Sequence, residues 1–117
     1  MTPTPISDFL SVGPQVRVAD LAALAEAGFR SVMCNRPDGE SPDDPQFAEI
    51  AKAAEALGMK AVYVPAAHNQ MGPALAQQFA TALQGMPKPV VAYCRSGARS
   101  SMLWSMARDF GMMDRVA

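Results

Sequence analysis

The chain has 117 residues, which is enough for one domain and too few for two domains of ordinary size. Half of the residues are hydrophobic, and ten Lys and Arg residues against eleven Asp and Glu residues leave a formal charge of −1. This balance argues against a polybasic surface for nucleic acid, and no apolar run is long enough to cross a membrane. The N-terminus lacks the pattern of a signal peptide and two cysteines cannot build a disulfide scaffold, so we expect one cytoplasmic domain over residues 1–117.

Proline and glycine residues divide the chain into alternating strand-like and helix-like segments. In chain order, the pattern predicts strand 6–12, helix 20–27, strand 29–34, a helix from 45 to 58, strand 60–64, a helix from 73 to 85, strand 89–93 and a last helix after 100. Helix N-caps are predicted at Asp20 and Asp44, and Leu103, Met106 and Phe110 are spaced for packing. The alternation indicates an α/β fold with a mostly parallel sheet flanked by helices, whose sites form where strands end.

The segment from Cys94 to Ser100 joins the most apolar predicted strand to the last predicted helix. A loop of this kind turns successive backbone N–H groups inward, and the helix behind it adds the positive end of its dipole. A cysteine at the mouth of such a cup should be held as a thiolate with a lowered pKa. Cys94 is therefore predicted to be a nucleophile, against the alternative of a buried cysteine that only packs.

The other residues of the loop have separate expected roles. Gly97 suits a position that needs a positive φ or a close backbone approach. Arg99 is expected to fold its guanidinium over a bound anion, and Ser100 either donates a hydrogen bond to the thiolate or caps the helix. The remaining positions, whose backbones are expected to cradle the anion, are Arg95, Ser96 and Ala98.

Four stretches of the sequence resemble a known family. They are Asn35–Glu40, Phe47–Ile50, Val64–Pro65 and Ala92–Ser100, and together they run through nearly the whole chain. The chain resembles the small bacterial beta-lactamase-hydrolase-like, protein-phosphatase-like domains. The resemblance implies a protein-tyrosine-phosphatase-like fold with a Cys-x4-Arg anion-binding loop, here Cys94 to Arg99. Members of the family are described both as phosphatases and as sulfur transferases.

The resemblance also implies partners and an assembly. Members occur alone or fused to persulfide dioxygenase or sulfide:quinone oxidoreductase modules, so enzymes of sulfide metabolism are the expected partners. The family continues with a further helix after the loop helix, whereas this sequence ends at Ala117. On that basis a homo-oligomer that closes one face of the sheet is expected.

The length of the loop favours sulfur transfer over phosphate hydrolysis. Cysteine phosphatases resemble one another in having five residues between the cysteine and the arginine, whereas four separate Cys94 from Arg99. The shorter loop resembles that of the rhodaneses. A tighter ring of N–H groups suits a cysteine persulfide better than a tetrahedral phosphate.

The absence of an obvious general acid favours the same reading. Phosphatases of this fold place an Asp roughly thirty residues before the cysteine, and the segment 62–72 has no Asp or Glu. It contains His68, which is either a surface residue or a proton donor. Asp38 lies on another loop and is either a turn-forming residue or a substitute donor. Sulfur transfer through a persulfide needs no such acid.

Two further residues near this edge of the predicted sheet have open roles. Arg36 either strengthens the positive cup or forms a salt bridge with Glu40. Cys34 is expected to pack at the end of its strand, with a role as a resolving thiol for Cys94 as the alternative. One histidine and two separated cysteines fall short of a zinc site, so no metal and no cofactor are expected.

From the sequence, the chain is expected to be a rhodanese-like sulfurtransferase. It would carry sulfane sulfur from thiosulfate or a low-molecular-weight persulfide, through a Cys94 persulfide, to a thiol or cyanide. The first alternative is a cysteine-dependent phosphatase of the protein-tyrosine or dual-specificity class. The second is a non-catalytic module that senses an anion or a persulfide.

Overall fold

The most apolar predicted strand, β5 (Val90–Tyr93), lies at the centre of a five-stranded sheet in the computed structural model, which describes residues 2–113. The other strands are β1 (Thr4–Pro5), β2 (Leu10–Gly13), β3 (Ser31–Cys34) and β4 (Lys60–Tyr63). The strand order is β1-β2-β5-β3-β4, and only β1 runs antiparallel to its neighbour. The predicted mostly parallel sheet is confirmed.

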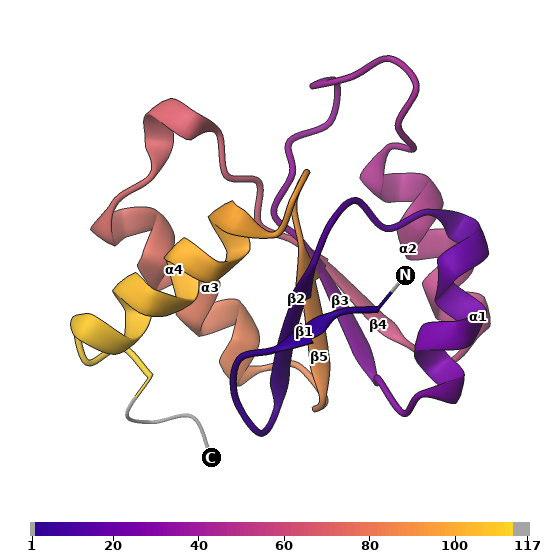
Figure 1. The fold of residues 1–117 in the computed structure, drawn as a ribbon, viewed down its shortest axis with the longest axis horizontal. Coiled ribbons are helices and arrows are strands. Elements are labelled where there is room, and N and C mark those ends of the chain that lie inside the picture. The colour runs from indigo at the N-terminus through magenta and orange to yellow at the C-terminus, as the bar shows by residue number, and fades with distance from the viewer. Residues whose placement is uncertain (1, 114–117) are drawn as a thin grey trace.

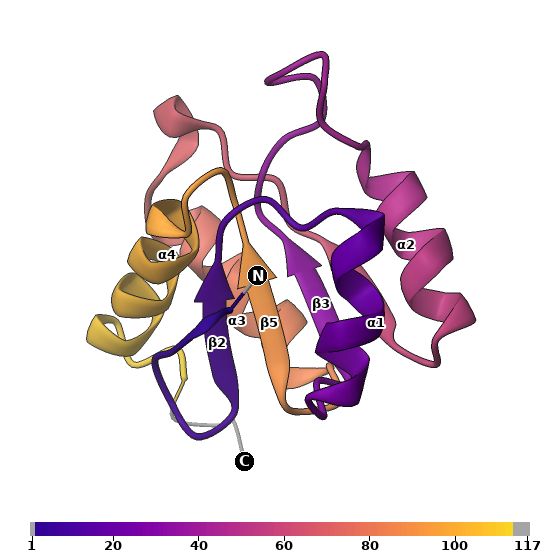
Figure 2. The ribbon, with the colours of Figure 1, turned by 45° about the vertical axis from the view of Figure 1, so that its right-hand side comes forward.

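Helices cover both faces of this sheet, as Figures 1 and 2 show. The helices α1 (Val18–Glu26) and α2 (Phe47–Ala56) lie on one face, and α3 (Pro73–Gln84) and α4 (Ala98–Asp109) lie on the other. A short 3-10 helix, η1 (His68–Gln70), precedes α3. Each face has its own buried apolar cluster, so the sheet is buried on both sides. None of the helices within residues 2–113 is long and apolar enough to span a membrane.

The apolar spacing of the helices is confirmed in part. Leu75, Phe79 and Leu83 are buried along α3, which begins with Pro73 in its first turn. Phe110, by contrast, is 55% exposed. It lies just beyond the last residue of α4, where the chain has already left the helix, so its predicted packing is wrong.

Both predicted N-caps are wrong, because other residues occupy the N-cap positions and each aspartate makes a different contact. The N-cap of α1 is Arg17, and Asp20 lies in the first turn, where its carboxylate accepts the Arg17 backbone N–H at 2.8 Å. The helix α2 begins at Phe47, whose N–H donates to the Asp38 carboxylate at 2.8 Å. The carboxylate of Asp44 pairs with two arginines instead.

The first predicted strand is also shorter than expected. Residues 6–9 form a turn, in which the Ser7 hydroxyl accepts the backbone N–H groups of Phe9 and Leu10 at 3.2 and 3.0 Å. A serine that binds its own backbone in this way competes with strand pairing. The turn makes β1 and β2 a hairpin at the edge of the sheet.

Candidate active site

The carboxyl ends of three neighbouring strands form the site. Cys94 follows β5 directly, and the loop 35–46 follows β3, which pairs with β5 in parallel. The strand β2 pairs with β5 on the other side and leads into Gln15. Figure 2 shows the segments after β2, β3 and β5 gathered at the same edge of the sheet. Both predicted loops therefore meet at one place, as expected for parallel strands.

The sulfur of Cys94 is held within its own loop. The Gly97 N–H donates to Sγ at 3.1 Å, and the residue Cys94 is 1% exposed. Burial by itself raises the pKa of the thiol, but the backbone N–H groups of Ser100, Arg99, Ser96 and Gly97 outweigh it, so the pKa of Cys94 is lowered. The thiolate is the form that these donors stabilise, and it is also the nucleophilic form.

The shape of the loop depends on Gly97. Its φ is +97°, and a Cβ built there would lie 3.3 Å from the carbonyl oxygen of Gly13. The same carbonyl accepts the Cys94 N–H at 3.4 Å, and the Gln15 N–H donates to the Arg95 carbonyl at 3.3 Å. The end of β2 therefore braces the loop from behind, and both features expected of Gly97 are confirmed.

We predict that Gly97→Ala destabilises the protein by about 2–3 kcal/mol, because it adds left-handed strain to a close backbone contact. Gly28→Ala is the matched control: its φ is +99° but nothing lies within 4 Å of the added Cβ, so it should cost only about 1 kcal/mol. Urea unfolding of the two variants measures the difference. Equal losses would show that the contact with Gly13 contributes nothing.

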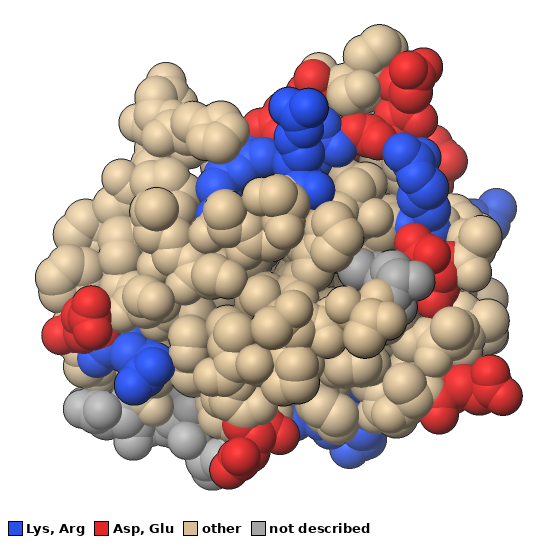
Figure 3. Space-filling view, in the orientation of Figure 1, with Lys and Arg blue, Asp and Glu red and all other residues tan. Residues whose placement is uncertain are grey.

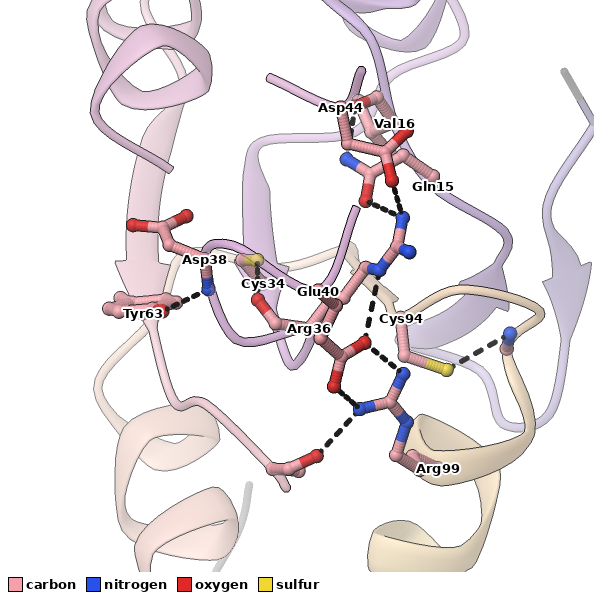
Figure 4. A network of polar contacts seen from close by, with 12 residues as sticks. Gln15, Val16, Cys34, Arg36, Asp38, Glu40, Asp44, Tyr63, Cys94 and Arg99 are labelled. Carbon is pink, nitrogen blue, oxygen red and sulfur yellow. Dashed lines mark hydrogen bonds and ion pairs between the residues drawn. The ribbon is translucent and has the colours of Figure 1, made fainter. Parts of the chain in front are cut away.

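Arg99 is fixed in front of the loop by a carboxylate. Its Nη1 and Nη2 donate to Glu40 Oε2 and Oε1 at 2.7 and 2.8 Å, and Nη1 also donates to the Ala66 carbonyl at 2.8 Å (Figure 4). The paired hydrogen bonds lower the pKa of Glu40 and raise that of Arg99, so both groups are charged. Such a fork-to-fork contact fixes the plane of the guanidinium. Glu40 is thus a positioning residue for Arg99.

Arg36 supports this arrangement and is bound to carboxylates. Its Nε donates to Glu40 at 3.1 Å, and its Nη1 contacts Asp44 and Gln15. The salt bridge with Glu40 is one of the two roles expected of Arg36. Because Glu40 and Asp44 bind its guanidinium, Arg36 is connected to the loop through Glu40. A direct contact of Arg36 with a bound anion stays a prediction.

Ser100 holds the loop to β3 through its side chain. Its hydroxyl donates to Asn35 Oδ1 at 2.8 Å, and Asn35 Nδ2 donates to the Val64 carbonyl at 3.0 Å. Both side chains are fully buried. The Ser100 hydroxyl therefore donates its proton to Asn35 and not to the thiolate, and α4 has no side-chain cap. The group of Ser100 that lowers the pKa of Cys94 is its backbone N–H.

The two predicted proton donors lie in different surroundings. The Asp38 carboxylate accepts the N–H of Phe47, and Figure 4 shows it pointing away from Cys94. The structure thus contradicts Asp38 as a donor to a group in the loop. His68 is exposed in η1, two residues after Ala66, whose carbonyl binds Arg99. The segment that carries His68 is therefore connected to Arg99 by the hydrogen bond to the Ala66 carbonyl.

Cys34 is separated from Cys94 by the sheet. It is in register with Tyr93 on the parallel neighbour β5, so those two side chains share the face covered by α1 and α2. The next residue, Cys94, points the other way, as Figure 4 shows. Burial raises the pKa of Cys34 to about 11, and its Sγ donates to the Arg36 carbonyl at 3.2 Å. These contacts fit the packing role and speak against a resolving thiol.

The pKa values of the two thiols should therefore be shifted in opposite directions, that of Cys94 downward and that of Cys34 upward. We predict that the ultraviolet absorbance of the thiolate, followed against pH, shows Cys94 ionising below its usual value of 9.0 and Cys34 ionising near pH 11. Titration of Cys94→Ser and Cys34→Ser assigns each transition. A Cys94 transition above pH 9.0 would contradict the arrangement of N–H donors described above.

Sequence reasoning missed the partners that position the loop. The sequence predicts Glu40 only as a salt-bridge partner of Arg36, and it predicts no role for the side chains of Asn35 and Gln15. The signal that was available is topological: a carboxylate following β3 lies beside an arginine following β5 when the two strands pair in parallel. The conformation of the loop 35–46, which decides the contact, is not visible in the sequence.

The fold and the loop define the protein-tyrosine-phosphatase-like class. The match to known proteins agrees: residues 4–110 match the family described as "Beta-lactamase hydrolase-like protein, phosphatase-like domain". The chain belongs to this family, as its resemblance implied.

Individual relatives are similar over most of the chain. A beta-lactamase hydrolase-like protein of Agrobacterium fabrum is 31% identical over 99 residues, which cover 85% of this chain and 23% of the relative. The chain thus spans about a quarter of the curated relatives it matches. The crystal structure of a candidate phosphatase from Neisseria meningitidis has a TM-score of 0.83 at 31% identity, covering 89% of this chain and 74% of that one.

A more distant structure shares the fold alone. The core catalytic domain of the PP-IP phosphatase SIW14 from S. cerevisiae has a TM-score of 0.59 at 18% identity, covering 99% of this chain and 79% of that one.

The comparisons overturn the expected sulfurtransferase activity. The family is described as phosphatase-like, and the similar solved structure at 31% identity is of a candidate phosphatase. The rhodanese reading rested on the four residues between Cys94 and Arg99. Because the match to the phosphatase-like family runs through this loop, that spacing does not separate the two classes. The expectation of a persulfide carrier loses its basis with it. The expected partners from sulfide metabolism rested on the family resemblance and stay a prediction.

Proposed function

We propose that the protein is a cysteine-dependent phosphatase that hydrolyses phosphate monoesters. The observation that carries this proposal is the pairing of a thiol stabilised as a thiolate with a guanidinium fixed beside the same loop. Gly97 N–H lies 3.1 Å from Cys94 Sγ, and Glu40 fixes Arg99 with hydrogen bonds of 2.7 and 2.8 Å. A nucleophile and a cation for the equatorial oxygens are what phosphoryl transfer requires.

The reaction divides into two displacements at phosphorus. In the first, the Cys94 thiolate attacks, an S–P bond forms and the P–O bond to the leaving group breaks. In the second, water attacks the phosphocysteine, the S–P bond breaks, and inorganic phosphate leaves with the thiolate restored. The backbone N–H groups of the loop and Arg99 stabilise the phosphoryl oxygens in both steps.

The leaving alkoxide needs a proton unless it is a stable phenolate. His68 is the donor that we propose, because Asp38 is bound to the N-terminus of α2 whereas η1 is tied to Arg99 through Ala66. The leaving oxygen takes the proton from the imidazolium in the first step, and the attacking water returns a proton to the imidazole in the second.

Hydrolysis of para-nitrophenyl phosphate tests the proposal directly. The purified chain should release inorganic phosphate from this ester in a reaction that vanadate inhibits. Cys34→Ser is the matched control, because it removes the chain's second thiol, on the other face of the sheet, and should keep the activity. A chain that binds vanadate but releases no phosphate from any monoester would contradict a phosphatase and leave a binding module.

A further inference from the structure

Arg95 differs from the other arginines at this edge of the sheet. Arg17, Arg36 and Arg99 each form a salt bridge with Glu40 or Asp44. The guanidinium of Arg95 is exposed and has no hydrogen-bond or salt-bridge partner among residues 2–113. It is therefore a cation next to the nucleophile that no carboxylate of the described chain neutralises.

The backbone of Arg95 is nevertheless fixed. It follows Cys94 directly, and its carbonyl accepts the Gln15 N–H at 3.3 Å. The backbone of Arg95 is thus fixed within the proposed phosphate-binding loop, while its side chain is exposed to solvent. A cation so placed meets the part of a substrate that lies outside the loop.

Arg95 is one of the residues that line a hollow at the surface. The hollow measures about 420 Å³ and is lined by Gln15, Arg36, Glu40, Ser41, Asp44 and Arg95. Glu40, one of its walls, also binds Arg99, so the hollow adjoins the group that faces the nucleophile. A volume of this size accepts a substituent of several heavy atoms.

The lining of the hollow balances two cations, Arg36 and Arg95, against two anions, Glu40 and Asp44. The two carboxylates are also bound by Arg17 and Arg99, so these four arginines and two carboxylates together carry two net positive charges, or one when the Cys94 thiolate is counted. The guanidinium of Arg95 is the one that shares neither carboxylate. Figure 3 shows Lys and Arg side chains gathered beside Asp and Glu side chains at the top of the molecule, the end of the sheet at which the parallel strands of Figure 1 finish.

We infer that the substrates carry a second anionic group, a carboxylate or another phosphate, which occupies this hollow and pairs with Arg95. This inference rests on the proposed function, since the phosphoryl group to be cleaved lies in the loop. An unpaired guanidinium binds a carboxylate or phosphate through two parallel hydrogen bonds. Arg95 is thus a specificity-determining residue, and a phosphoester without the second anion leaves it unused.

Matched aryl phosphates test this inference. The carboxylate series is phenyl phosphate with a para carboxymethyl, carboxyethyl or carboxypropyl group, and each member is paired with its primary carboxamide, which has the same size and no charge. For the best-fitting pair, kcat/KM of the wild-type protein should be about 10-fold higher with the carboxylate, mainly through a lower KM. Added salt should reduce this preference.

Arg95→Met should remove the preference, and Arg95→Lys should keep part of it. Arg30→Met is the control of equal charge change, because Arg30 is exposed just before β3, at the opposite end of the strand from the site, and should keep the full preference. Equal rates with acid and amide across the series, or a preference that survives Arg95→Met, would overturn the inference while leaving the phosphatase intact. Failure to hydrolyse any of these esters would overturn both.

Discussion

Replacing Cys94 with serine should lower kcat/KM for para-nitrophenyl phosphate by roughly 10⁴-fold or more, because the variant has no thiolate to form the covalent intermediate. A serine hydroxyl is close in size and can accept the same Gly97 N–H, which lies 3.1 Å from Sγ in the wild type. The backbone cup is therefore retained, and the variant should still bind vanadate or phosphate. Steady-state kinetics and calorimetric titration with phosphate measure the two properties separately.

The control for this variant is Cys34→Ser, which should retain activity within a few-fold. Cys34 lies on the other face of the sheet, and burial raises the pKa of its thiol to about 11. Comparable losses in the two variants would mean that neither thiol is the nucleophile and that the decline reflects folding. Urea unfolding of both variants distinguishes that case.

Arg99→Lys should lower kcat/KM by about 10²–10³-fold, the effect of removing an oriented donor from a transition state that gains charge. Lysine keeps the positive charge but cannot make the two contacts, of 2.7 and 2.8 Å, that fix the guanidinium on Glu40. The loss should therefore fall mainly on kcat. Kinetics with a single aryl phosphate at fixed ionic strength measure it.

Glu40→Gln is the companion variant for Arg99. It leaves the arginine in place and replaces the carboxylate that orients it with a neutral amide, so a smaller loss than that of Arg99→Lys is expected. Full activity in Arg99→Lys would contradict the role of a fixed guanidinium. A loss confined to KM would assign Arg99 to ground-state binding alone.

The parallel sheet and the loop at its edge were predictable from the sequence because their signals are local. Val90–Tyr93 is a continuous apolar run, which is typical of a buried strand. Gly97 indicates a turn with positive φ, a conformation that other residues rarely adopt. Those two features place Cys94 at the end of a buried strand and before a helix. The thiolate-stabilising cup follows from that placement alone.

The contacts that position Arg99 were not predictable, because they depend on a long loop. Glu40 lies 59 residues before Arg99, and the hydrogen bonds between them require a particular path of the loop 35–46. The same loop places Asp38 on the N-terminus of α2. A carboxylate in such a loop has several possible partners, and the sequence does not rank them.

The choice of chemistry was wrong for a different reason. Loop length was used to separate phosphatases from rhodaneses, although a cup of backbone N–H groups stabilises any small anion at its centre. The number of residues between Cys94 and Arg99 sets the size of the ring of N–H groups, but it does not determine which anion the ring binds. The family match over residues 4–110 supplied the information that the spacing lacked.

The most direct test of the account is the mass of the protein after rapid acid quenching during turnover of an aryl phosphate. The account predicts an adduct of about 80 Da, one phosphoryl group, carried on the peptide that contains Cys94. The adduct should be absent from Cys94→Ser and present in Cys34→Ser. Turnover with an unmodified Cys94, or with the phosphoryl group on another residue, would contradict the central claim that this thiolate is the nucleophile.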